Sequence, residues 1–211
     1  VTIKAGDSTA SSDGTGGHIT ITTGQGTKQS SGNLVMRTED GGNPGGVSGI
    51  VILSSGDATA AGPSGAMYLG TGDSTGGTGG DITVTVGTGN TGAGGNLILS
   101  SGTSSGGASG RLYLGSGNAA GPTAGASGAM AIGTGSAANG ASGDISIFVG
   151  DAATLDTTHY KGGDLLLSAG KPTATASGGH VAITSGSSTV TTAGHLSLRT
   201  ADSGPTGTSG S

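Results

Sequence analysis

Histidine and acidic side chains are the groups in this 211-residue sequence that could hold a metal ion or move a proton. The sequence contains four His and 12 Asp plus Glu. His18, His180 and His195 each follow the glycine that begins a short repeat, and in other repeats this position holds Asn, Asp or Arg. A metal site needs several ligands at one centre, and one histidine per repeat does not supply them. We therefore predict no metal site and no cofactor.

Calcium is the metal with the nearest sequence signal. Gly-Gly-Asp occurs at 79–81 and at 162–164, and it is similar to the sequence of calcium-binding parallel β-rolls. Those rolls supply carboxylates from a nine-residue repeat, turn after turn. The acidic residues of this chain do not recur in that way, so the sequence argues against calcium binding.

No group of residues has the pattern of a catalytic centre. A nucleophile needs a positioned base and a third group that orients the base, and no repeat combines these residues. We therefore predict that the protein is not an enzyme. The longest insertion is expected to protrude as a loop, either as a contact for a partner or as a tolerated surface insertion. Its residues include Asp156, His159, Tyr160 and Lys161.

The composition excludes several classes of protein. There is no cysteine, so disulfides and thiolate chemistry are excluded. Only seven residues are Lys or Arg and the net charge is −5, which argues against nucleic acid as a partner. No apolar run approaches the roughly 18 residues of a membrane-spanning helix, and the N-terminal residues do not form a signal peptide.

A repeat organises the whole sequence. Each repeat reads Gly-x-Φ-x-Φ, where Φ is aliphatic, and a loop of Gly, Ser, Thr and Ala follows. Because residues two apart share one face of a strand, every repeat offers one apolar face. We predict one continuous array over 1–211 that is part of a longer chain without caps. The repeats begin near Gly17, Gly32, Gly49, Gly65, Gly80, Gly95, Gly110, Gly128, Gly143, Gly163, Gly179 and Gly194.

The predicted fold is all-β, a parallel β-solenoid of about 13 short strands with two repeats, about 31 residues, per coil. Similar repeats are separated by even numbers of repeats. Ala66-Met67 and Ala129-Met130 lie four repeats apart, as do the Val-Gly repeats at 81–87 and 144–150. An antiparallel sandwich is the alternative.

A two-repeat coil would place an apolar stripe on one face. The stripe consists of the residue between the two Φ positions in every second repeat. An extended apolar patch usually marks an interface, so we predict that the stripe mediates assembly. Its members are Val35, Tyr68, Ile98, Ala131 and Leu166.

Two resemblances to known proteins follow from these residues. The sequence at 131–140 resembles the head repeat of trimeric autotransporter adhesins. The whole array, with 79–92 and 101–110 as examples, resembles long Gly/Ser/Thr-rich tandem-repeat proteins of algae and related protists. The second resemblance implies an extracellular or cell-surface fibre, and it implies no catalytic residues.

The predicted function is therefore structural. We expect a subunit of an extracellular filament or surface appendage that assembles by lateral packing of β-solenoid faces. The partners are other copies of the chain, together with matrix or appendage proteins. An adhesin stalk is one alternative. An ice-binding β-solenoid is another, because Thr20/Thr22 and Thr83/Thr85 form Thr-x-Thr pairs.

Overall fold

Extended backbone and loops make up the described part of the chain. The computed structural model describes residues 1–9, 14–60, 62–120, 125–152, 162–173 and 175–204, together with 207 and 210. Within these residues there is no α-helix and no β-strand, only extended chain interrupted by turns and bends. The predicted all-β parallel solenoid is therefore wrong.

The reason lies in the backbone hydrogen bonds. A strand needs a neighbouring strand that pairs with its N–H and C=O groups. Among the described residues, the backbone hydrogen bonds lie within loops or join the two ends of a loop. The Gly-x-Φ-x-Φ pattern favours an extended segment with one apolar face, but it does not supply the partner for that segment within the same chain.

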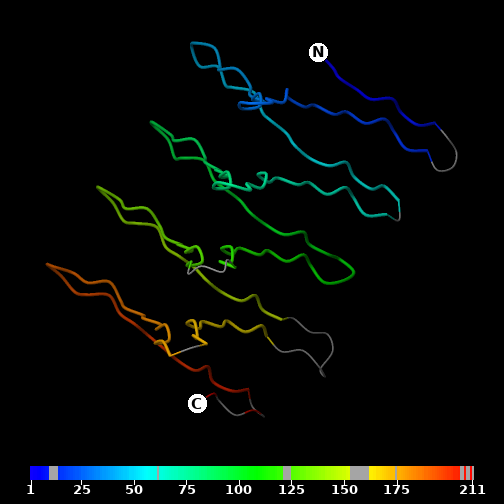
Figure 1. Ribbon diagram of the computed structural model, residues 1–211. Coiled ribbons are helices and arrows are strands. Elements are labelled where there is room, and N and C mark those ends of the chain that lie inside the picture. Colours follow the sequence, from blue (N-terminus) through cyan, green and yellow to red (C-terminus); the bar gives the residue numbers. More distant parts are fainter. Residues whose placement is uncertain are drawn as a thin grey trace. The chain divides into compact units, whose positions relative to one another are not determined.

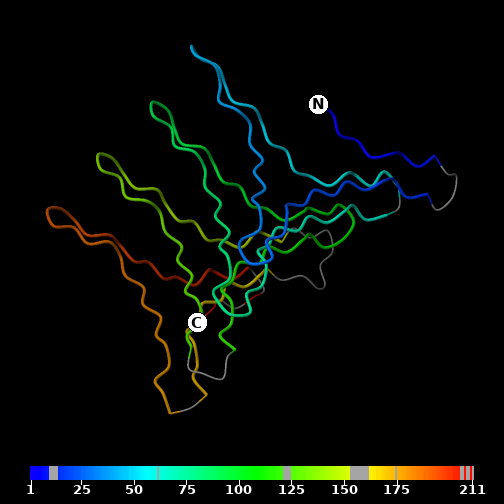
Figure 2. The same cartoon turned by 45° about the horizontal axis from the view of Figure 1, so that its top comes forward.

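The chain divides into two units, Val1–Ser100 and Ser101–Ser211. In each unit, extended segments alternate with Gly-rich loops, and described loops that are three apart in the chain point in the same direction (Figures 1 and 2). In the first unit, for example, the loop around Asn43–Gly45 and the loop at 87–94 point the same way (Figure 1). The loops between them point in two other directions.

Neither unit has a hydrophobic core in its described residues. No described side chain is buried, and even the least exposed of the large apolar residues, Val86, is 41% exposed. The aliphatic residues of the repeats therefore face solvent or open space in the single chain. Globular domains instead bury such residues against a second layer of structure.

Local contacts shape the loops. Gly45 has a φ of +80°, a conformation that glycine adopts without a steric penalty. The hydroxyl of Ser104 accepts a hydrogen bond of 3.0 Å from the N–H of Gly107. The hydroxyl of Ser188 accepts one of 2.8 Å from the N–H of Thr191. Such serine turns reverse the chain with few residues.

Candidate assembly surface

Short hydrogen bonds between glycines close the loops. The N–H of Gly17 donates to the carbonyl of Gly6 at 2.8 Å, and that of Gly194 donates to Gly186 at 2.8 Å. Because each bond joins the end of one extended segment to the beginning of the next, consecutive segments meet in antiparallel directions at the loop. The same bond joins Gly32 to Gly24, Gly110 to Gly102 and Gly179 to Gly170.

The glycine that begins each repeat also faces the end of the preceding segment. A Cβ added to Gly17 would lie 3.1 Å from the Cβ of Ala5, and one added to Gly95 would lie 2.7 Å from Cγ1 of Val86. The close approach favours glycine on one side and mostly small residues on the other. The facing residues are Ala5, Thr23, Thr38, Ser55, Thr71, Val86, Ser101, Ser116, Thr134, Val149, Ala169, Ser185 and Thr200.

Each repeat places its two aliphatic residues on one face of the extended segment, because residues two apart in an extended chain point to the same side. In the repeat that begins at Gly95, these residues are Leu97 and Leu99. We call the two Φ positions of each repeat the inner pair.

The residue between the two Φ positions has a different environment. Val35 is 74% exposed, whereas its neighbours Leu34 and Met36 are 57% and 65% exposed. Alternate residues of an extended chain point to opposite sides, so this outer residue points away from the inner pair. The same order of exposure occurs around Ile52, Tyr68, Ile98, Tyr113 and Leu166.

The five residues predicted to mediate assembly occupy these outer positions. All five are exposed. Among the four with large side chains, Tyr68 is the most exposed, at 93%. The two-repeat coil that would align them in one stripe is absent from the described residues. The complete set is Val35, Tyr68, Ile98, Ala131 and Leu166.

The recurrence of the loops has a signal in the sequence that the predicted two-repeat coil does not take into account. The outer residue is often identical in repeats that are three apart, and it is never identical in repeats that are two apart. This matches the loop directions, which also recur at every third loop (Figure 1). The identical pairs are Ile52 with Ile98, Tyr68 with Tyr113, Ala131 with Ala182 and Ser146 with Ser197.

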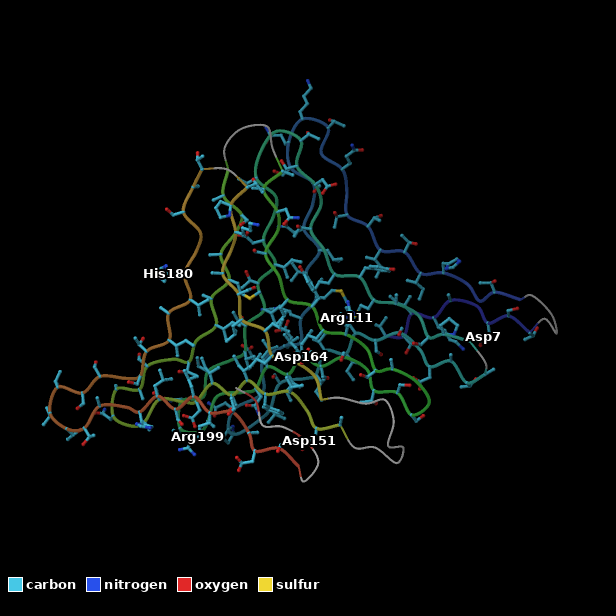
Figure 3. The ribbon with its side chains drawn as sticks, turned by 90° about the horizontal axis from the view of Figure 1, so that it is seen from below. Asp7, Arg111, Asp151, Asp164, His180 and Arg199 are labelled. Carbon is cyan, nitrogen blue, oxygen red and sulfur yellow. The ribbon has the colours of Figure 1, made fainter. Side chains whose placement is uncertain are left out.

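In the described part of the chain, two ion pairs join charged residues that are near neighbours in the sequence. Lys4 lies 2.7 Å from Asp7, and Arg37 lies 3.3 Å from Glu39, with all four side chains exposed. Exposed ion pairs of this kind contribute little to stability. Figure 3 shows labelled charged residues of the second unit on separate stretches of chain.

The histidines form no metal centre among the described residues, where no three or more His, Asp or Glu gather in a group that could hold an ion. His18, His180 and His195 are all among the described residues. The predicted protruding loop, with Asp156, His159, Tyr160 and Lys161, lies outside the described residues.

Comparison with protein families, with curated proteins and with solved structures finds no match for this chain. Within the described residues, no helix is long and apolar enough to cross a membrane.

Proposed function

We propose that the chain is a structural subunit of an extracellular filament or surface appendage, and that the filament assembles from copies of the chain. The observation that carries this proposal is the unburied apolar surface. The described residues have no core, although an aliphatic pair recurs in every repeat. Such surface is usually covered by a partner, and a regular array is best matched by a second array with the same spacing.

The outer residues give the filament its lateral contacts. Val35, Tyr68 and Leu166 are large, apolar and at least 74% exposed. Their side chains point away from the inner pairs, so they remain available when the inner pairs are covered. Only 9% of the residues are charged, which keeps electrostatic repulsion between copies small.

Electron microscopy of the purified full chain tests this proposal. We expect filaments from the native chain. Tyr68→Ser combined with Leu166→Ser should raise the concentration needed for filaments by about tenfold or more, because each lost contact removes on the order of 1 kcal/mol of apolar burial. Thr83→Ser is the matched control, since Thr83 is already a polar outer residue. A native chain that stays dispersed at every concentration would overturn the proposal.

A further inference from the structure

The inner pairs require a partner that covers them, and the exposed area of the chain shows how large that interface must be. The chain exposes 20573 Å², whereas a compact monomer of 19.3 kDa exposes about 8,500 Å². The excess is about 12,000 Å² per chain, far above the roughly 800 Å² that each partner buries in a standard interface. A single contact between two surfaces cannot cover this area, but copies that intertwine along their whole length can.

The backbone also needs this partner. Described extended segments such as 97–100 and 112–116 make no backbone hydrogen bond, and the bonds that do form lie in the loops. Unpaired extended backbone is a template for another extended chain. The partner must therefore offer extended segments at the same spacing, together with an aliphatic face, and another copy of this chain has both.

The number of copies follows from the path of the chain. In each unit, described loops that are three apart point in the same direction (Figures 1 and 2), and outer residues recur with the same period. If the chain turns by one third of a full rotation at each repeat, a three-fold rotation brings each repeat into the direction of the next repeat. Three copies related by that axis therefore interleave without overlap, and closed symmetry of this kind is common in homo-oligomers.

We infer that three copies of the chain interleave, so that the extended segments of two copies fill the space between successive turns of the third. The inner pairs are covered inside this trimer, and the outer residues remain on its surface. The inference deepens the proposed function and rests on it, because the trimer is the unit that would pack into filaments. In this arrangement each repeat lies beside the next repeat of a neighbouring copy.

Mixed-chain disulfide formation tests this adjacency, and the absence of native cysteine gives a clean background. Full chains carrying Val35→Cys are mixed with chains carrying Ile52→Cys, unfolded, refolded together and oxidised. Consecutive repeats should lie about 4.8 Å apart between copies, within the Cα separation that a disulfide spans. We expect a disulfide-linked dimer of the two chain types.

The matched control replaces Ile52→Cys by Tyr68→Cys, which moves the second thiol one repeat further. This pair should link at least tenfold less, because two strand spacings exceed the reach of a disulfide. More linkage with Tyr68→Cys than with Ile52→Cys would overturn the inference. So would no linkage with either in chains that sediment like the native protein.

A second set of cysteine variants, in the other unit, keeps the test valid if a variant of the first set fails to assemble. Leu166→Cys mixed with Ala182→Cys should link, and Leu166→Cys mixed with Ser197→Cys should not. Linked trimers that form no filaments would refute the proposed function and support the interleaving. Filaments without linkage between consecutive repeats would overturn the interleaving and leave the proposed function in place.

Discussion

Two valines of one repeat can show whether association buries the inner pairs or simply any exposed apolar residue. Val181 belongs to an inner pair and is 56% exposed, whereas Val190 lies in the following loop and is 90% exposed. Val181→Ser and Val190→Ser make the same chemical change at these two places. If association depended only on exposed apolar area, the loop variant would have the larger effect. The interleaved trimer predicts the opposite.

The size of the effect follows from the remaining exposure. Full burial of a valine side chain is worth about 1.5–3 kcal/mol, and roughly half of Val181 is still exposed in the single chain. Its burial on association therefore contributes about 1 kcal/mol per copy, or about 3 kcal/mol per trimer. Since 1.4 kcal/mol corresponds to a tenfold change in an equilibrium constant, Val181→Ser should weaken the trimer by on the order of 100-fold.

Sedimentation equilibrium over a range of concentrations measures this change. Val190→Ser should alter the dissociation constant by no more than about threefold, because substitutions away from buried contacts have small effects. The reasoning is refuted if the two variants weaken association equally, or if Val181→Ser leaves it unchanged.

Three further outcomes are expected. Gly95→Ala should open its loop and raise amide hydrogen exchange there, because the new Cβ would lie 2.7 Å from Cγ1 of Val86. Gly72→Ala is the control and should leave exchange unchanged, because no atom lies within 4 Å of the added Cβ. Gly45→Ala should destabilise its turn by about 1 kcal/mol, since its φ is +80°, and exchange of the amides in that turn should rise accordingly. Association should change less than about threefold between 50 mM and 500 mM salt, because the described ion pairs are exposed; a steep decrease with salt, measured by sedimentation, would contradict this.

The sequence contains enough to locate the loop contacts. The glycine-first pattern places Gly17 or Gly95 at the start of a repeat, and these are the positions where the chain approaches its preceding segment closely. Alternation within each repeat also separates the inner pair from the outer residue. Both properties are local, so they can be read from a few neighbouring residues.

The pairing of the segments could not be predicted in the same way. The register and partner of an extended segment depend on contacts that are distant in sequence, and those contacts can come from another chain. The even separations between similar repeats, such as Ala66-Met67 and Ala129-Met130, led to a two-repeat coil. The recurrence of Tyr68 at Tyr113 indicates three repeats instead, and only the outer residues, taken alone, make that period visible.

The mass of the native full chain in solution tests the central claim most directly. Native mass spectrometry at low ionic strength should give a species of three times the 19.3 kDa chain mass, which dissociates to single chains on unfolding. A folded species with the mass of one chain would contradict the account, because the aliphatic pairs of every repeat would then remain uncovered. A dimer would contradict it as well, since two copies cannot fill a path that recurs at every third loop.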